Sequence, residues 1–181
     1  MIPDRLKKGD VIGLISPSHV ASEERYKFII TKIESFGYRV KVSANMYSDT
    51  YGYLASEEER ASDFNAMACD PEVRMVFFGG GDGALEILPL IDYGAVARDP
   101  KIYMSYSDGT SILGAIYSKT GLTTYYGQSP SCFEDLRYYD YAEFMLHIAD
   151  TGQESRPGEV RHIRPKAPLP GHDKGQRNRG L

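Results

Sequence analysis

Short apolar runs alternate along this chain with stretches in which apolar residues recur every three or four positions. The first pattern is typical of buried strands, and the second is typical of amphipathic helices. Ser22 and Ser56 precede two of the helical stretches, and Gly37 and Gly121 end two of them, as cap residues do. Strands are predicted at 11–15, 38–42, 74–78, 101–106 and 123–126, and helices at 22–36, 56–68, 85–91, 110–119 and 141–149.

Strands that are separated by helices of this length pair in parallel through crossover connections. The predicted fold class is therefore α/β, an open, doubly wound and mostly parallel sheet with flanking helices, of the Rossmann or flavodoxin type. Such sheets bind ligands at the carboxyl ends of their strands. The segments that follow the predicted strands are 16–19, 79–83, 105–109 and 126–129.

The composition changes abruptly after about residue 152. From Ser155 onward there are seven Lys or Arg against two Asp or Glu, and the segment 152–181 contains four prolines and almost no apolar periodicity. Such a segment cannot bury enough surface to fold alone. We therefore predict one domain over 1–152 and an irregular, disordered tail over 153–181, with a basic arm for an acidic partner as the alternative.

Charge and composition exclude several functional classes. The net charge of −4 at pH 7 argues against nucleic acid as the main partner, because phosphate binding needs a basic surface. No apolar run reaches the roughly 18 residues of a membrane span. The two cysteines are too few for a disulfide framework and lack the spacing of a zinc site. We expect a cytoplasmic protein with reduced thiols, no metal and no cofactor.

Ser107 lies where a strand passes into a helix, in the segment Ser-Tyr-Ser-Asp-Gly over 105–109. Small residues two positions before and after a serine are typical of a nucleophile elbow, a sharp turn that exposes the hydroxyl. The N–H of Asp108 would then face an oxyanion formed on Ser107. A simple helix N-cap is the alternative for the same residues.

The segment Gly-Gly-Gly-Asp-Gly over 79–83 follows a predicted strand and precedes a helical stretch. Glycines let the backbone approach a ligand closely and direct N–H groups at negative charge. The turn is a candidate second oxyanion donor or a phosphate cradle, although it matches no established nucleotide fingerprint. A flexible turn without a function is the third alternative.

At these two motifs the sequence resembles the LD-carboxypeptidase family of serine peptidases, which includes the microcin C immunity proteins. The segment PEVRMVFFGGGDGALEILPLIDY is similar to that family's strand, glycine turn and helix, and KIYMSYSDGTSIL is similar to its nucleophile motif. The resemblance covers roughly residues 5–150. It implies that Ser107 is the nucleophile and that the backbone of Gly80 or Gly81, together with Asp108, holds the oxyanion.

The sequence departs from the family pattern at Gly79, Asp82, Ser105 and Gln128. We expect Asp82 and Tyr106 to contact the substrate. The resemblance also implies a Ser-Glu-His triad whose Glu and His lie in a C-terminal domain that this sequence lacks. His19 is the one histidine expected at the ligand edge of the sheet, and a solvated loop residue is the favoured interpretation of it.

We therefore expect the nucleophile-bearing half of a hydrolase that cleaves murein tetrapeptides or peptidyl-nucleotide amides, inactive when alone. A binding or interaction module without catalysis is the alternative, and a nucleotide-binding regulator is a weaker one. Aromatic side chains uncovered by the missing half are expected to drive homodimerisation or other self-association. They are Tyr103, Tyr106, Tyr125, Tyr126 and Phe133.

Overall fold

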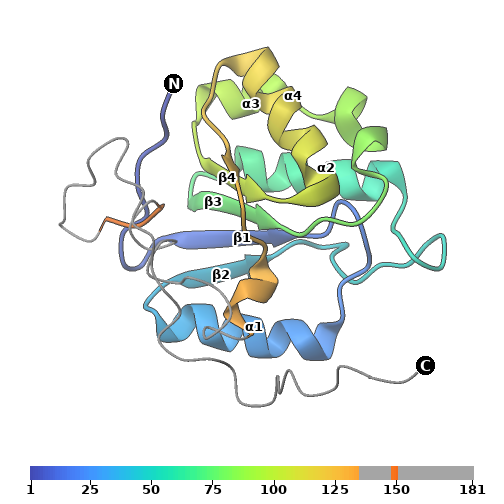
Figure 1. The fold of residues 1–181 in the computed structure, drawn as a ribbon, viewed down its shortest axis with the longest axis horizontal. Coiled ribbons are helices and arrows are strands. Elements are labelled where there is room, and N and C mark those ends of the chain that lie inside the picture. The colour runs from blue at the N-terminus through green and yellow to red at the C-terminus, as the bar shows by residue number, and fades with distance from the viewer. Residues whose placement is uncertain (135–147, 151–181) are drawn as a thin grey trace, which may run out of the picture.

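The computed structural model describes residues 1–134 and 148–150, and it contains one five-stranded parallel sheet (Figure 1). The strand order is β2-β1-β3-β4-β5, which confirms the predicted α/β class and is the order of flavodoxin-type sheets. The strands are β1 (Val11–Ile15), β2 (Arg39–Val42), β3 (Val73–Phe78), β4 (Ile102–Ser105) and β5 (Tyr125–Tyr126).

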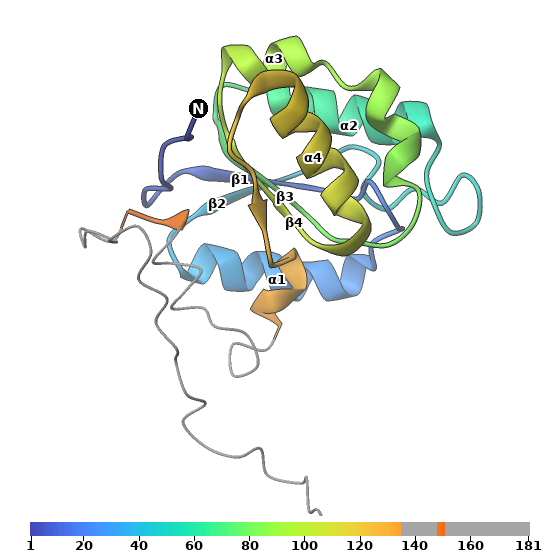
Figure 2. The same ribbon diagram turned by 45° about the horizontal axis from the view of Figure 1, so that its top comes forward.

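Helices cover both faces of the sheet (Figures 1 and 2). Helix α1 (Glu23–Ser35) packs on one face, and α2 (Glu57–Cys69), α3 (Tyr93–Arg98) and α4 (Thr110–Thr120) pack on the other. Every residue of β1 is buried, because this strand lies inside the sheet with a hydrophobic core on each side. That burial explains why β1 has an unbroken apolar sequence rather than an alternating one.

Local sequence signals set the helix ends. The Ser56 hydroxyl accepts from the Glu59 N–H, and the Glu59 carboxylate accepts from the Ser56 N–H, which makes a complete capping box at the start of α2. Helix α4 ends at Gly121, which has a φ of 70°. A left-handed residue at this position strongly favours glycine.

The helical prediction for 85–91 is confirmed with a shift of one residue, since Ala84–Leu90 forms a helix of the 3₁₀ type, η1. Pro89 lies inside it and has no N–H to donate to an α-helical hydrogen bond. The prediction missed α3, whose N-cap Asp92 accepts from the Ala95 N–H at 2.8 Å. Two further 3₁₀ turns are η2 (Ser107–Gly109) and η3 (Pro130–Phe133).

Residues near the two ends of the described chain pair with each other. Leu6 forms an isolated parallel bridge with Ala149. The Leu6 N–H donates to the Ile148 carbonyl at 2.8 Å, and the Asp150 N–H donates to the Leu6 carbonyl at 2.7 Å. The predicted helix over 141–149 therefore does not include Ala149. Its residues 141–147 lie outside the described residues, as does the predicted disordered tail over 153–181.

The expectation of uncovered aromatic side chains was wrong for two of the five residues. Tyr103 is fully buried and stacks on Phe64, with ring centroids 5.6 Å apart. Phe133 is also fully buried and contacts Phe36. Tyr106 and Tyr126 are exposed, by 41% and 67%, so fewer aromatic groups face solvent than predicted.

Among the described residues, no helix has both the length and the apolar character that crossing a membrane requires.

Candidate active site at the carboxyl edge of the sheet

The loops that follow β1, β3 and β4 converge at the carboxyl edge of the sheet. In the sheet, β1 lies between β2 and β3. After β1 the chain passes to the face where α1 packs, and after β3 it passes to the opposite face, where α3 packs. A crevice at such a switch point is the usual ligand site of this architecture. The segments 16–19, 79–83 and 105–109 thus lie at one edge, as the sequence predicts.

Ser107 occupies a strained turn. Its φ is 55°, and it is the one non-glycine residue with a positive φ in the described chain. L-amino acids avoid this region, and such strain concentrates at functional sites. Ser107 is exposed and begins η2, directly after β4 and Tyr106. The predicted strand-to-helix turn with strained backbone is therefore confirmed, whereas the nucleophilic role stays a prediction.

Small neighbours permit this turn, as expected of an elbow. The Ser105 hydroxyl is buried and donates to the Gly79 carbonyl at 3.2 Å, which ties β4 to the end of β3. A Cβ on Gly109 would overlap the Ser105 side chain and would lie 3.1 Å from the Phe78 ring. Any larger residue at 109 would therefore push the elbow away from the sheet.

The glycine turn lies against Ser107. A Cβ on Gly80 would be 2.7 Å from the Ser107 Cβ, 2.7 Å from the Tyr106 carbonyl oxygen and 3.4 Å from the Ser107 hydroxyl. A Cβ on Gly81 would overlap the Ser18 carbonyl. Only glycines allow three backbone segments to approach this closely. Gly80 thus lies directly against the Ser107 side chain, and the role of Gly80 or Gly81 as an oxyanion donor stays a prediction.

Asp108 makes a contact that sequence reasoning missed. Its carboxylate accepts from the Ala84 N–H at 2.9 Å and so joins the elbow to the start of η1. Asp82 and Tyr106, the predicted substrate contacts, are exposed at the rim of the site. Their role in binding stays a prediction.

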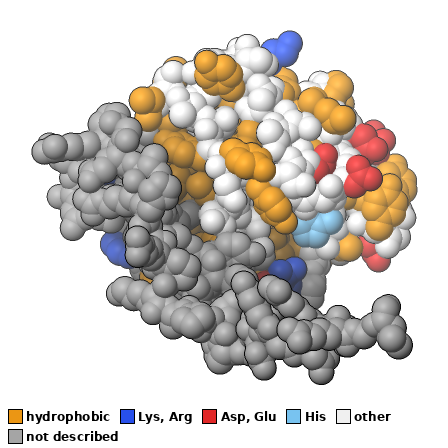
Figure 3. Space-filling model, in the orientation of Figure 1, with side chains coloured by type: hydrophobic (Ala, Val, Ile, Leu, Met, Phe, Trp, Pro, Cys, Tyr) orange, Lys and Arg blue, Asp and Glu red, His pale blue; other side chains and the backbone are white. Residues whose placement is uncertain are grey.

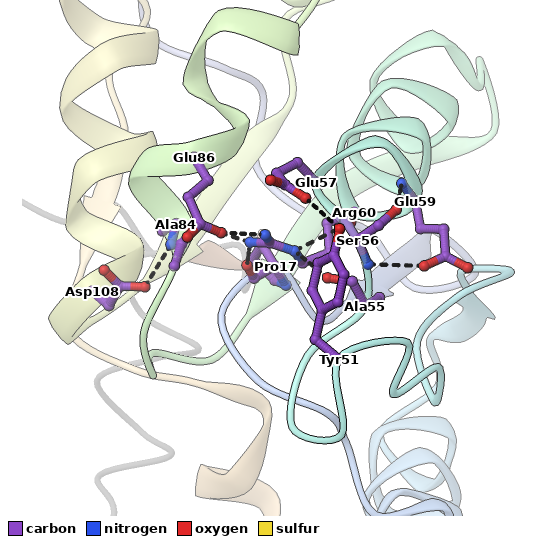
Figure 4. A network of polar contacts seen from close by, with 11 residues as sticks. Pro17, Tyr51, Ala55, Ser56, Glu57, Glu59, Arg60, Ala84, Glu86 and Asp108 are labelled. Atoms are coloured by element: carbon purple, nitrogen blue, oxygen red, sulfur yellow. Dashed lines mark hydrogen bonds and ion pairs between the residues drawn. The ribbon is translucent and has the colours of Figure 1, made fainter.

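A buried arginine, also missed from the sequence, holds the surrounding loops together (Figure 4). Arg60 on α2 is 2% exposed and donates to the carbonyls of Pro17 and Gly83, each at 2.8 Å. It also donates to the Ala55 carbonyl at 2.9 Å and to the Glu86 carboxylate at 2.5 Å. One guanidinium therefore connects the loop after β1, the glycine turn, α2 and η1. Its fork of donors suits such multiple contacts.

His19 lies beside the glycine turn. A Cβ atom added to Gly79 would be 2.9 Å from the Cε1 atom of the His19 ring. Burial lowers the pKa of the imidazole, a hydrogen bond with the Gly80 backbone opposes that shift, and the nearby Arg25 charge lowers the pKa further. His19 is therefore neutral at pH 7 and lies against the turn rather than free in solvent. The space-filling view shows hydrophobic and acidic side chains gathered close together at one side of this face of the molecule (Figure 3).

Among the described residues, the Ser107 hydroxyl has no positioned base. Among them, no histidine or carboxylate hydrogen-bonds to the Ser107 hydroxyl. Residues 1–134 and 148–150 also contain no group of three His, Cys, Asp or Glu side chains that could hold a metal ion. A serine hydroxyl without a positioned base is a weak nucleophile near neutral pH.

Comparisons with known proteins identify similar sequences. Residues 12–127 match the family model described as the LD-carboxypeptidase N-terminal domain. The chain is 36% identical over 147 residues to YocD of Bacillus subtilis, which is named as a carboxypeptidase, and the match covers 79% of this chain and 45% of YocD. It is 35% identical over 127 residues to the microcin self-immunity protein MccF of Escherichia coli, over 67% of this chain and 37% of MccF.

Solved structures show the same fold. An MccF-like protein from Bacillus anthracis has a TM-score of 0.70 at 34% identity, over 74% of this chain and 42% of that protein. MccF in complex with glutamyl sulfamoyl guanosine has a TM-score of 0.75 at 29% identity, over 83% of this chain and 48% of MccF. The chain spans less than half the length of these relatives. The strained serine, the adjoining glycine turn and the match over residues 12–127 together show that the chain belongs to the LD-carboxypeptidase family and contains its N-terminal domain.

Proposed function

We propose that this domain carries the nucleophile of an LD-carboxypeptidase-type serine hydrolase, and that Ser107 is that nucleophile. The observation that supports the proposal most strongly is the positive φ of Ser107 at a turn that lies directly against Gly80. The substrates are small peptides or peptidyl-nucleotides. MccF, a relative, has been solved with an aminoacyl sulfamoyl nucleoside bound, which supports this substrate class.

In the proposed reaction the Ser107 hydroxyl oxygen attacks the carbonyl carbon of the scissile amide, and its proton passes to a general base. The resulting oxyanion accepts hydrogen bonds from the backbone N–H groups of Asp108 and of Gly80 or Gly81. Collapse of the intermediate breaks the C–N bond, releases a protonated amine and leaves an acyl group on Ser107. Water then hydrolyses this ester and restores the serine.

The base and its orienting carboxylate come from outside the described residues in this proposal, since no described histidine or carboxylate bonds to the Ser107 hydroxyl. We further propose that this base lies outside the chain, so that the isolated chain turns over substrate negligibly, because a triad without its base loses several orders of magnitude of rate. That missing base also favours a second candidate function, a module that binds the same ligands without cleaving them.

Both cysteines are free, as expected in the cytoplasm, where we place the protein.

The test uses a fluorophosphonate, which marks activated serines, and glutamyl sulfamoyl guanosine, which reports ligand binding. We expect slow phosphonylation confined to Ser107, no labelling of Ser107→Ala, and calorimetric binding of the nucleoside to both proteins. Labelling elsewhere, or none at all, would contradict the nucleophile assignment and leave the binding module. Rapid turnover of a murein tetrapeptide that Ser107→Ala abolishes would show instead that a base is present in this chain.

We also propose that the chain self-associates through the face around Ser107, where Tyr106 and Tyr126 remain exposed. Contiguous exposed apolar patches larger than roughly a few hundred Å² commonly mark binding sites for partner proteins. Light scattering after size exclusion should give a mass above 20.2 kDa. A monomer at micromolar concentration would refute this part of the proposal.

A further inference from the structure

The elbow and the glycine turn over 79–83 are joined by two side chains, one at each end of the turn. At its start, the Ser105 hydroxyl donates to the Gly79 carbonyl at 3.2 Å. At its end, the Asp108 carboxylate accepts from the N–H of Ala84, the residue that follows the turn, at 2.9 Å. Both side chains belong to the elbow, so the segment that carries the proposed nucleophile holds both ends of the turn.

The Ser105 hydroxyl occupies an enclosed space. Ser105 is 0% exposed, and a Cβ added to Gly109 would overlap its hydroxyl oxygen. The absence of a side chain at Gly109 therefore leaves room for the hydroxyl. A buried hydroxyl is costly without a hydrogen bond, and the bond to the Gly79 carbonyl satisfies it.

The Asp108 carboxylate acts where η1 begins. Gly83 precedes η1 and, having no side chain, makes no capping hydrogen bond of its own. The first N–H groups of a helix need an acceptor, and Asp108 supplies one from 24 residues away in the chain. Because an ionised acceptor makes a stronger hydrogen bond than a neutral one, this contact ties the end of the glycine turn to the elbow.

The sequence of the turn makes such restraints consequential. Residues 79–81 are consecutive glycines, and glycine gives the backbone more conformational freedom than any other residue. Gly80 nevertheless lies against Ser107, since a Cβ added to Gly80 would be 2.7 Å from the Ser107 Cβ. Displacement of a catalytic group by about 1 Å can cost roughly 10²-fold in rate. A contact that fixes the turn relative to Ser107 therefore affects the rate of a reaction at Ser107.

We propose that the Ser105 hydroxyl and the Asp108 carboxylate are positioning groups that together hold the glycine turn at a fixed distance from Ser107. The proposal rests on the proposed function, because the turn supplies an oxyanion donor in that reaction. It gives neither side-chain group a contact with the substrate, and it applies to whichever backbone N–H of the turn acts. Each contact holds one end of a turn that is free to move between them, so both are required.

Ser105→Ala removes the first contact and keeps the Cβ. Its matched control is Ser118→Ala, because the Ser118 hydroxyl also donates to a backbone carbonyl, that of Ala115 at 3.1 Å. Ser118 is exposed and lies in the last turn of α4, at the end of the helix away from the elbow. Thermal unfolding checks that every variant folds.

Asp108→Ala removes the second contact, whereas Asp108→Asn keeps a neutral acceptor oxygen for the Ala84 N–H. The matched control is Asp92→Ala, since the Asp92 carboxylate accepts from the Ala95 N–H at 2.8 Å at the start of α3. Asp108 is only partly buried, so its variants decide the question even where Ser105→Ala folds poorly.

The first measurement follows backbone amides by NMR, as hydrogen exchange at Ala84 and as chemical shifts and ¹⁵N relaxation at Gly80 and Gly81. Loss of a hydrogen bond to a charged group should raise exchange at Ala84 roughly tenfold in Asp108→Ala, and by less in Asp108→Asn. We expect the Gly80 and Gly81 amides to broaden or shift in Ser105→Ala and Asp108→Ala. They should match wild type in both controls.

The second measurement is the rate of Ser107 phosphonylation as a function of fluorophosphonate concentration, which separates the rate constant of bond formation from the affinity for the reagent. We expect the rate constant to fall by roughly 10²-fold in Ser105→Ala and in Asp108→Ala, with the affinity changed by only a few-fold. Asp108→Asn should regain part of the loss. A lower stability alone would leave the rate constant of the folded protein unchanged.

The double variant tests whether the two groups act together. Removal of either contact releases the turn, so the loss of rate in the double variant should be well below the product of the two single losses. A loss equal to that product would show two independent effects and would overturn the joint role.

The proposed function and the positioning role fail separately. If wild-type Ser107 is never labelled, the proposed function fails, and the amide data still decide whether the two side chains hold the turn. If the Gly80 and Gly81 amides of Ser105→Ala and Asp108→Ala match wild type, the positioning role is overturned. Rate constants in these two variants equal to those of the controls would overturn it as well.

Discussion

Replacing Arg60 by methionine is the sharpest test of the network that surrounds the glycine turn. The methionine keeps much of the apolar volume of the side chain and removes all five N–H donors. The carbonyls of Pro17, Ala55 and Gly83 would lose a donor within 2.9 Å. The loss of the guanidinium would destabilise the Glu86 carboxylate less, because the Glu86 side chain is 50% exposed and water can take the place of the guanidinium.

Each buried acceptor left without a donor costs about 1–3 kcal/mol. The removed desolvation penalty of the guanidinium and the gain in apolar packing offset part of that loss. We therefore expect Arg60→Met to lower the free energy of unfolding by about 3–5 kcal/mol, which lies in the lower half of the summed cost of three unsatisfied carbonyls. Such a loss is a large part of the total stability of a small domain, about 5–15 kcal/mol.

Equilibrium urea denaturation followed by far-ultraviolet circular dichroism measures the change, since the chain has no tryptophan to report by fluorescence. Arg25→Met is the matched control. Arg25 is 51% exposed and pairs with Glu134 at the surface, so its loss should cost less than about 1 kcal/mol. If Arg60→Met folds too poorly to measure, Arg60→Lys keeps the charge without the fork and should lose a smaller amount. Equal losses in Arg60→Met and Arg25→Met would refute the reasoning.

Three further predictions concern Ser107, the thiols and His19. Ser107→Gly should be more stable than Ser107→Ala by about 1–2 kcal/mol, because only glycine adopts a positive φ without strain. Equal thermal unfolding temperatures of the two variants would contradict the presence of strain at Ser107. Burial raises the pKa of Cys132 to about 12, so Ellman's reagent should titrate only the exposed Cys69 at pH 8 and both thiols in denaturant; two fast native thiols would contradict this. Burial and the Arg25 charge lower the pKa of His19 below 6.5, so the folded state resists protonation. The associated stability is fully present above pH 6.5 and is lost as the pH falls through the pKa of the folded state. The unfolding free energy of wild type should therefore fall more steeply below pH 6.5 than that of His19→Leu, and identical pH profiles would disprove the assignment.

Periodicity predicted the sheet because the strands carry enough apolar residues to be recognised one at a time. The capping box at Ser56 and the C′ glycine at Gly121 likewise act within a few residues, so their effect is visible in sequence. α3 was missed because it has only six residues, although the Asp92 N-cap was a usable signal. η1 was predicted as helical, and Pro89 in its interior is the residue that disfavours an α-helix there.

The candidate site also combines features that the local sequence predicts with features that it does not. The strained turn at Ser107 follows from the spacing of small residues around it. The contacts of Arg60 and Asp108 do not, because both depend on segments that meet only in three dimensions. One signal was available: Arg60 shares a helix face with Phe64 and Met67, which are both buried. A charged residue in an apolar stripe is buried with partners or not at all.

The bridge between Leu6 and Ala149 also has a consequence for the chain while it is being made. Leu6 is synthesised long before its partners, because the carbonyl and N–H that hold it belong to Ile148 and Asp150. At roughly 5–20 residues per second, the gap between them is on the order of ten seconds. For the first part of that interval β1 also lacks β3, one of its two neighbours in the sheet, and its apolar side chains are only partly covered. The nascent chain therefore presents a partly uncovered apolar segment to chaperones before its contacts with β3 and Ile148 can form.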